Sequence, residues 1–491
     1  MICGRRLGSL LKSALTPFQA GCMNSVDLAF TSAIDQARLI RAKEISPLEL
    51  TELYLERIER LNPQLGSFFT VTADRALSDA KAKTDQLMQT DRAEELPPFF
   101  GVPTAIKDLT AVADVPCSYG LRVIRDRIEK EDAGVVTRIK NAGFILLGKT
   151  ATSQLGSTPY TEPPGFPPAR NPWNLDYTTG GSSGGAAAAI AAGLCAVAHG
   201  SDGGGSIRGP AACCGIVGIK PSRGRVSLAP VGDRLSGLAV DGPLARTVAD
   251  AAAMLDVMAG YTVGDPYWLP DPNPSFLAAA NRSLQSCKIA YITDFPPIGE
   301  AHPLCKQAVL DTAQRLEQWG HAIEPVTLNF TDIIEPLVTV WQAGVDVGVP
   351  WLVLNRFNRW LLRQAKRRSS GQYLQAVSKM QTAARRIVAA FSPYDAVIAP
   401  VYLHPTIRVG EWKSLSPAKT LQQIMNWIAP CPPINATGQP AIALPALFTE
   451  SGLPIGIQLI GRPAAEETII SLAAQLEATH PWHSPKPPIA L

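Results

Sequence analysis

Hydrophobic positions change their spacing along the chain, and the change separates predicted helices from predicted strands. Between Ser25 and Asn62 leucines and isoleucines recur at helical spacing, and Ser46-Pro47-Leu48-Glu49 has the residue types of a helix N-terminus. A further helix is expected over 133–141. Short apolar runs of strand length are found at 68–71, 102–107, 144–147 and 194–198.

The middle of the chain is rich in small residues. A Gly/Ser/Pro-rich stretch covers 156–185, and an alanine-rich segment over 184–192 then predicts a helix. The strand at 194–198 is expected to enter a loop over 200–205. Strands and helices that alternate in this way predict an α/β fold. We expect a mixed, twisted β-sheet, mostly central and covered by helices.

The second half of the chain continues this alternation. Residues 265–345 have the composition of a variable insertion that contains one strand–helix–strand unit, and residues 350–390 are helical and basic. The tail returns to strands at 396–400, 441–445 and 456–460, followed by a helix that ends near Leu476. Since no linker is polar enough to divide it, we expect one large domain over 23–491.

Composition excludes several classes of function. The chain has 491 residues, 46% of them hydrophobic, and a formal net charge of +3, so there is no basic track for nucleic acid; Lys366-Arg367-Arg368 is the densest cluster. No apolar run reaches 18 residues, so no membrane span is expected. The nine cysteines have irregular spacing without a CxxC pair, which favours reduced thiols in the cytoplasm and no metal site.

Residues 1–22 differ from the rest. They carry Arg5, Arg6 and Lys12 around a short Leu/Ala stretch, and a second methionine stands at Met23. A targeting segment is one reading, but Lys12 and Pro17 interrupt the apolar part. We expect a disordered extension or a translation start placed too early.

The segment from Gly143 to Thr150 matches the phosphate-binding pattern GxxxxGK[ST] but has the wrong context. A phosphate-binding loop consists of small residues after a strand and before a helix. Here the four residues between the glycines are bulky and apolar, and a predicted helix precedes them. We therefore expect a buried strand and no nucleotide.

Three segments contain residues suited to acyl transfer. Gly203-Gly204-Gly205 precede Ser206, and a run of free N–H groups beside a serine is what an oxyanion hole requires. Gly180-Gly181-Ser182-Ser183-Gly184-Gly185 precedes the alanine-rich helix. Lys107 ends an apolar run, where burial would lower its pKa and allow a neutral amine to act as a base. Each segment alone has a structural reading as a turn, a helix cap or a surface lysine.

Together these segments resemble the amidase signature family. The block from Gly180 to Lys220 is similar to the family's signature, with Ser182 and Ser206 separated by 24 positions. Further similar motifs occur in the same order along residues 25–480: Gly101–Asp108, Asn171–Asn174, Asp241–Asp250, Asn435–Pro440 and Gly452–Gln458.

The resemblance implies a Ser–cis-Ser–Lys triad. By position Ser206 is the nucleophile, Ser182 is the bridging serine after a cis peptide bond, and Lys107 is the base. The N–H groups of Gly203, Gly204, Gly205 and Ser206 would form the oxyanion hole. Three residues are expected in support: Ser183 by a hydrogen bond to Lys107, and Asp202 and Arg208 as braces of the loop, for which a purely structural ion pair is the alternative. No metal or organic cofactor is implied.

Within the family, the sequence of the signature block is similar to those of general amidases and 6-aminohexanoate cyclic-dimer hydrolases. This resemblance implies hydrolysis of a small-molecule amide. Two alternatives stay open: the A subunit of glutamyl-tRNA amidotransferase, and a non-catalytic binding homologue. The stretch from Ser236 to Pro243 lacks the Leu-Asp-Gln typical of the A subunit. A homodimer is also open.

Two positions depart from the pattern of many members. Ala151 and Gln154 stand where Asn and Glu are frequent, which leaves the substrate pocket undefined. Trp341, Trp351 and Phe357 are candidate pocket walls, with core packing as the alternative.

Overall fold

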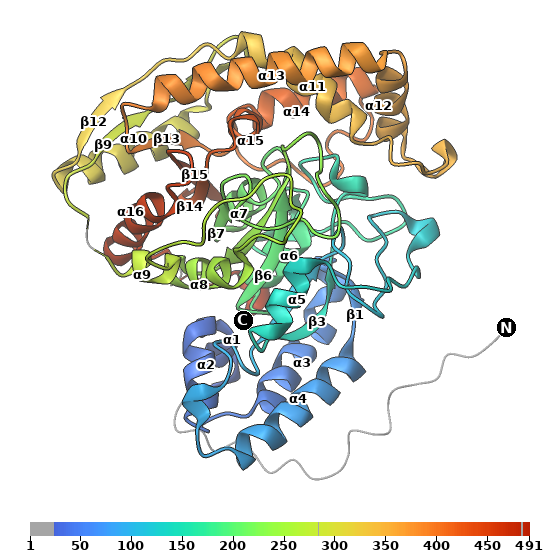
Figure 1. Ribbon diagram of the computed structural model, residues 1–491, viewed down its shortest axis with the longest axis vertical. Helices are drawn as coiled ribbons and strands as arrows, with labels where there is room; N and C mark the ends of the chain where they lie inside the picture. Colours follow the sequence, from blue (N-terminus) through green and yellow to red (C-terminus); the bar gives the residue numbers. More distant parts are fainter. Residues whose placement is uncertain (1–23, 283, 483–484) are drawn as a thin grey trace.

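One mixed β-sheet of eleven strands forms the centre of the computed structural model, which describes residues 24–282, 284–482 and 485–491 (Figure 1). Helices cover the sheet, and the single α/β domain predicted from the sequence is confirmed. The expectation for residues 1–22 lies outside the described residues.

The order of strands across the sheet brings together segments from the whole chain. The order is β1 (Phe68–Val71), β3 (Ile145–Thr150), β2 (Pro103–Lys107), β6 (Val197–Asp202), β8 (Val240–Ala245), β7 (Val217–Lys220), β14 (Ala441–Phe448), β15 (Pro454–Gly461), β13 (Ala396–Pro400), β9 (Lys288–Tyr291) and β12 (Ala322–Pro325). Strands β2 and β6 are parallel neighbours, so their carboxyl ends meet at the same edge.

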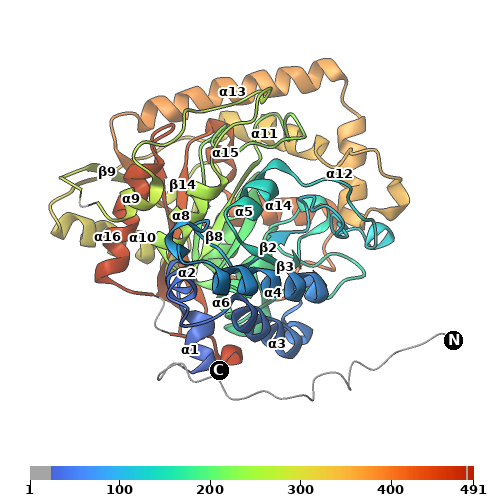
Figure 2. The same ribbon diagram turned by 60° about the horizontal axis from the view of Figure 1, so that its bottom comes forward.

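The N-terminal helices form one end of the molecule, as Figures 1 and 2 both show. They are α1 (Ser25–Phe30), α2 (Ala33–Arg41), α3 (Pro47–Leu65) and α4 (Ala73–Gln89). The predicted start of α3 is confirmed: the Ser46 hydroxyl accepts from the Glu49 N–H, and the Glu49 carboxylate accepts from the Ser46 N–H at 2.8 Å.

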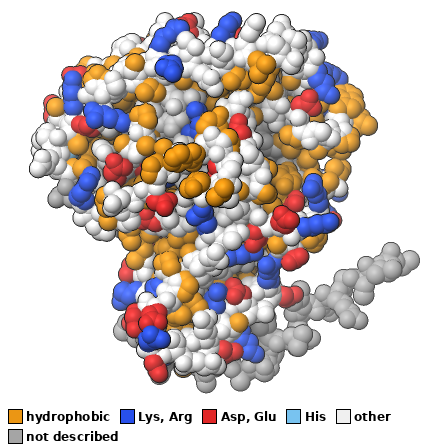
Figure 3. Space-filling view, viewed as in Figure 1, with side chains coloured by type: hydrophobic (Ala, Val, Ile, Leu, Met, Phe, Trp, Pro, Cys, Tyr) orange, Lys and Arg blue, Asp and Glu red, His pale blue; other side chains and the backbone are white. Residues whose placement is uncertain are grey.

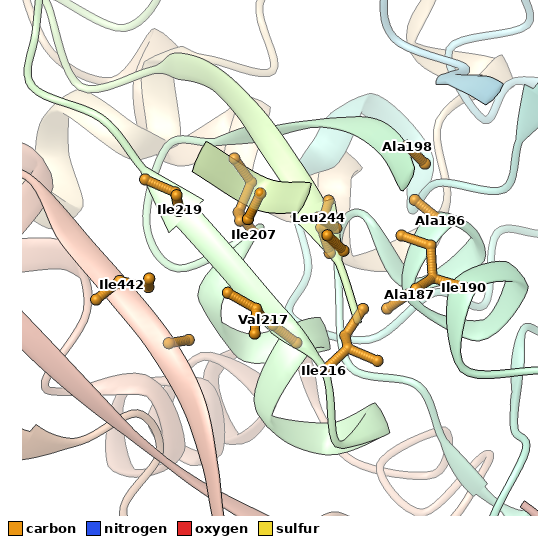
Figure 4. Packing of buried hydrophobic residues seen from close by; sticks show 14 of the residues in the cluster. Ala186, Ala187, Ile190, Ala198, Ile207, Ile216, Val217, Ile219, Leu244 and Ile442 are labelled. Carbon is orange, nitrogen blue, oxygen red and sulfur yellow. The ribbon is translucent and has the colours of Figure 1, made fainter. Parts of the chain in front are cut away.

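The alanine-rich helix α6 (Gly184–Ala191) lies in the core, and all of its residues are buried. Its small side chains let it approach the sheet closely. Figure 4 shows Ala186, Ala187 and Ile190 packed beside Ala198 and Leu244 of the neighbouring strands. Helix α7 (Arg208–Cys214) is also fully buried.

Two details of the predicted strands are now settled. Helix α5 (Gly134–Asn141) precedes the buried strand β3, which confirms that Gly143–Thr150 is not a phosphate-binding loop. The strand predicted over 194–198 is displaced, because β6 continues to Asp202 in antiparallel pairing with β8. The glycine loop therefore begins at Gly203 and not at Gly200.

The strand–helix–strand unit predicted within 265–345 extends the sheet at its edge. Strand β9 pairs in parallel with β13 on one side and with β12 on the other. Helix α10 (Pro303–Gln318) connects β9 to β12, and α8 (Val248–Met258), α9 (Phe276–Ala280) and α16 (Glu466–Thr479) pack nearby. Two short hairpins lie outside the sheet: β4 (Arg170–Asn171) with β5 (Asn174–Thr178), and β10 (Asp294–Phe295) with β11 (Gly299–Glu300).

The end of the molecule opposite α1–α4 is helical (Figures 1 and 2). It contains α11 (Thr331–Ala343), α12 (Arg356–Lys366), α13 (Ser370–Phe391), α14 (Pro417–Ile428) and α15 (Pro432–Thr437), which agrees with the helices predicted over 350–390. On the face in Figure 3, Lys/Arg and Asp/Glu side chains are interspersed. Within the described ranges, no helix combines the length and hydrophobicity needed to cross a bilayer.

A first prediction concerns the close packing of α6. Replacing Gly185 by alanine would push a Cβ atom into the backbone of Ala151 and Ser67. We expect Gly185→Ala to lower the free energy of unfolding by about 1–3 kcal/mol, because the overlap involves main-chain atoms that cannot rotate away. Urea denaturation followed by circular dichroism measures this.

Gly371→Ala is the matched control. Gly371 is also the second residue of a helix, α13, and the nearest atom to its added Cβ is the Ser369 hydroxyl at 3.7 Å. This variant should be unchanged or slightly stabilised, because alanine favours helices. Equal stability of the two variants would contradict the close packing of α6.

Candidate active site

The candidate site lies at the carboxyl ends of β2 and β6. Lys107 is the last residue of β2 and Asp202 the last of β6, and the loop Gly203–Ile207 then leads into α7. Ser182 lies in the turn before α6. The structure thus brings together residues from three separate segments of the sequence.

Lys107 is completely buried, and its ammonium nitrogen is surrounded by oxygens. The Nζ atom lies 2.8 Å from the Ser182 Oγ, 3.0 Å from the Ser201 Oγ and 3.1 Å from the Ser201 carbonyl oxygen. Since all three groups are neutral, Lys107 has hydrogen-bond partners but makes no direct ion pair.

This environment favours the neutral amine. Burial lowers the pKa of Lys107 from 10.5 to about 7, while the carboxylates of Asp241 and Asp202 oppose the shift and Arg234 adds to it. An amine of this pKa can accept a proton near neutral pH, as predicted from the apolar run that precedes Lys107.

Ser182 and Ser206 lie on segments that are bonded to each other. The Gly181–Ser182 peptide bond is cis, as the resemblance implies. The N–H of the next residue, Ser183, donates to the Ser206 carbonyl at 3.1 Å. This bond ties the turn before α6 to the loop that carries Ser206.

The expected bond from Ser183 to Lys107 is not formed. The Ser183 hydroxyl donates to the Ser201 carbonyl at 3.2 Å, and that carbonyl also accepts from Lys107. Because Ser201 ends up beside Lys107 on the neighbouring strand, it takes the place that the sequence assigned to Ser183. Ser183 and Lys107 thus share the Ser201 carbonyl as an acceptor.

Asp202 shapes the glycine loop. Its carboxylate accepts from the N–H of Gly205 at 2.7 Å and from the N–H of Ile207 at 3.2 Å. Gly205 has a φ of +115°, a conformation open to glycine, and an added Cβ would touch Cys431. Asp202 thus bonds to two N–H groups of this loop, and its role as a brace stays a prediction.

The N–H groups of the loop fall into two sets. That of Gly205 is engaged by Asp202, which departs from the predicted oxyanion hole. Those of Gly203, Gly204 and Ser206 donate to no group in the described part of the chain. The same three residues are partly exposed.

Arg208, the first residue of α7, holds Asp202 in place. Its guanidinium donates to both carboxylate oxygens, at 3.0 and 3.1 Å, and further to the side chains of Asn435 and Gln458. Both charged groups are fully buried. Burial alone would raise the pKa of Asp202, but Arg208 holds it well below the usual range.

A second buried pair lies next to Lys107. The Nε2 atom of His199 lies 3.5 Å from a carboxylate oxygen of Asp241, an ion-pair distance without hydrogen-bond geometry. Asp241 faces Ser201 across β6 and β8. Burial would raise the pKa of Asp241, but His199 and nearby cations lower it.

Comparisons with known proteins agree with this geometry. A family-wide sequence profile named Amidase matches residues 49–470. A relative from Synechocystis sp., itself provisionally described as an amidase, is 49% identical over 461 residues, which is 94% of this chain and 90% of the relative. The chain belongs to the amidase family.

Other similar proteins carry more specific names. An acylamidase of Rhodococcus erythropolis is 31% identical over 95% of this amidase and 98% of its own length. A 6-aminohexanoate cyclic dimer hydrolase, solved with its substrate, matches with a TM-score of 0.87 at 28% identity over 94% of this chain and 100% of its own. This amidase is an amide-hydrolysing enzyme with the amidase signature fold.

The two positions that depart from the family pattern have structural roles in this amidase. Ala151 is buried against Gly185, and its backbone bonds to the start of α6. The Gln154 side chain accepts from the Asn355 N–H at 2.8 Å and from the Asn358 amide at 3.0 Å. Gln154 thus fixes the loop near Ser182 to the start of α12.

Of the three aromatic candidates, one lines a cleft beside the glycine loop. Trp341 lies in an apolar groove that also contacts Gly203 and Gly204. Trp351 lies under the guanidinium groups of Arg359 and Arg363. Phe357 is buried against Trp341, with ring centroids 6.1 Å apart, so core packing is its role.

Sequence reasoning gave no role to several residues of the site. Ser201 contacts Lys107, Asp241 lies opposite Ser201 and pairs with His199, and Asn435 and Gln458 bind Arg208. All five lie in segments that resemble motifs of the family, His199 and Ser201 within the block from Gly180 to Lys220. The sequence pattern alone gave none of them a role.

The second prediction concerns the brace beneath the glycine loop. We expect Asp202→Asn to lower the free energy of unfolding by about 3–5 kcal/mol, because Arg208 is then buried without a counter-charge. Thermal and urea denaturation measure the loss.

Asp176→Asn is the matched control. Asp176 pairs with Arg408 at 3.5 Å, and both side chains are largely exposed. Exposed ion pairs contribute little to the free energy of unfolding, so the denaturation midpoint of Asp176→Asn should stay near that of the wild type. A similar small change in both variants would show that the buried pair does not support the loop.

Proposed function

We propose that this amidase cleaves its substrate through an acyl-enzyme on Ser206, with Ser182 as the proton relay and Lys107 as the base. The observation that carries the proposal is the contact of 2.8 Å between the Lys107 Nζ and the Ser182 Oγ in a fully buried setting. The hydrogen bond from the Ser183 N–H to the Ser206 carbonyl supports it further, because it holds the two serine segments side by side.

The oxygens around Lys107 match a neutral amine. A protonated lysine has three N–H donors, while the neutral form has two and one lone pair. The carbonyl and hydroxyl oxygens of Ser201 can accept both N–H groups. The lone pair is then left for the Ser182 hydroxyl, which is the arrangement that a base requires.

In the acylation half, Lys107 takes the Ser182 proton while Ser182 takes the Ser206 proton. The Ser206 Oγ forms a bond to the carbonyl carbon, and the N–H groups of Gly203, Gly204 and Ser206 stabilise the oxyanion. The relay then runs in reverse. Ser182 protonates the amide nitrogen, the C–N bond breaks, and the amine leaves.

In the deacylation half, water takes the place of the amine. The same relay removes a proton from water, its oxygen attacks the acyl carbon, and the bond to the Ser206 Oγ breaks as that oxygen regains a proton. The product is a carboxylic acid.

The proposal extends to the setting of the enzyme. The seven described cysteines are free and buried, which supports a reducing, cytoplasmic compartment. We propose a free amidase that acts on a small-molecule amide without an amidotransferase partner. The reason is that Ser236–Pro243 lacks the Leu-Asp-Gln sequence typical of the amidotransferase A subunit. A homodimer stays an open prediction.

The third prediction tests the nucleophile. A fluorophosphonate probe should label the wild-type chain covalently, and Ser206→Ala should abolish labelling and lower kcat for a simple anilide by about 10⁴-fold or more. Mass spectrometry locates the adduct.

Ser414→Ala, at an exposed serine, is the matched control and should label normally. Equal labelling of Ser206→Ala would remove Ser206 from its role and favour a non-catalytic homologue. Hydrolysis by the purified chain alone is expected; activity only with added subunits would favour the amidotransferase.

The fourth prediction is a pH dependence. Because only neutral Lys107 accepts a proton, kcat/KM should rise as pH increases through about 7. The Asp241 carboxylate raises the pKa of Lys107, so Asp241→Asn should move the rise to lower pH. Arg234 lowers that pKa, so Arg234→Gln should move the rise to higher pH.

The exposed Asp271→Asn should leave the profile unchanged. Shifts of the same sign in Asp241→Asn and Arg234→Gln would contradict the assignment of the rise to Lys107.

A further inference from the structure

An apolar groove opens onto the glycine loop. Gly203 and Gly204 line one end of it, and an added Cβ on Gly204 would lie 3.7 Å from Pro432 at the start of α15. Helices α11 and α14 provide the two sides of the groove, in the helical end of the molecule (Figure 1). The groove is therefore continuous with the loop that carries the free N–H groups.

The two helices turn apolar faces toward this groove. The lining residues of α11 are spaced three or four positions apart, as are those of α14, and some lie beside one another in the sequence. This spacing places them on one face of each helix. The lining residues from the two helices are Ile333, Ile334, Leu337, Val338, Trp341, Leu421, Ile424, Met425 and Ile428.

The remaining walls are apolar as well. Phe295 and Ile298 come from the segment of the β10–β11 hairpin, and Phe330 precedes α11. No charged or amide side chain belongs to the lining within the described residues. A charged substituent would lose its hydration here without gaining a partner, whereas an aliphatic chain would gain by leaving water.

The groove reaches the site at the glycine loop. Among the described residues, its lining includes Gly203 and Gly204 but none of Lys107, Ser182 and Ser206. The Ser182 hydroxyl instead lies beside Gly156, whose added Cβ would be 3.4 Å from it. Since Ser182 protonates the leaving nitrogen in the proposed mechanism, the amine belongs on the Gly156 side and the acyl group on the groove side.

We propose that this groove binds the acyl chain of the substrate, so that the enzyme prefers amides of medium-length, unbranched aliphatic acids. The inference rests on the proposed function of Ser206, Ser182 and Lys107, and adds the class of acyl group. The distance along α11 from Ile333 to Trp341 is about 12 Å, which accommodates an extended chain.

The fifth prediction compares two substrate series. With p-nitroanilides from acetyl to decanoyl, kcat/KM should rise about fourfold for each added methylene until the groove is filled. With acetamides of amines from butylamine to decylamine, kcat/KM should change little. A flat acyl series, or a rise in the amine series alone, would overturn the assignment.

Groove-filling variants test the location. Val338→Trp should abolish the gain from longer acyl chains, so that kcat/KM becomes similar for the decanoyl and acetyl anilides, because the chain no longer fits in the groove. The milder Val338→Phe should shift the optimum to shorter chains. Val347→Trp makes the same change at an exposed position outside the groove and should retain the full chain-length preference.

The readouts separate this inference from the proposed function. Phosphonate labelling of Ser206 and hydrolysis of the acetyl anilide report on the catalytic residues. If both persist in Val338→Trp while the long-chain preference is also unchanged, the groove assignment is wrong and the catalytic proposal stands. If the wild type shows no labelling and no hydrolysis, the catalytic proposal itself fails.

Discussion

The burial of one lysine amine is the constraint on which the site depends. Lys107 lies at the end of a central strand with no exposed surface, where a charged amine would lose its hydration without gaining a direct counter-charge. Its contacts are the oxygens of Ser182 and Ser201. The fold thus lowers the pKa of this amine to about 7, and the proposed chemistry needs the neutral form.

The loop that carries Ser206 has a different physical basis, a buried charge pair. Asp202 and Arg208 are only six positions apart, and Arg208 also binds Asn435 and Gln458 from the last quarter of the chain. In this loop the Gly205 N–H is bound by Asp202, while those of Gly204 and Ser206 have no acceptor among the described residues. Precise placement of loop donors therefore depends on residues far away in the sequence.

The sequence indicated much of this architecture because its strongest signals are local. Glycine runs, the alanine-rich helix and the helix start at Ser46 could be read directly, and the linked motifs pointed to Lys107, Ser182 and Ser206. Predictions from the sequence failed where the pairing of distant strands determines the local structure. The polar segment Gly200–Asp202 resembles a loop but belongs to β6, because β8 supplies its hydrogen bonds. Likewise Ser201 replaces Ser183 beside Lys107 only because β2 and β6 are neighbours.

The protonation state of Lys107 can be measured directly by NMR. In protein labelled with ¹³C at the lysine ε-carbon, the Lys107 resonance is assigned as the one missing from Lys107→Met, and its shift is followed as pH varies. We predict a midpoint near 7 for Lys107. A midpoint near the ordinary value of 10.5 would contradict it, because the amine would then be charged where the mechanism needs a base.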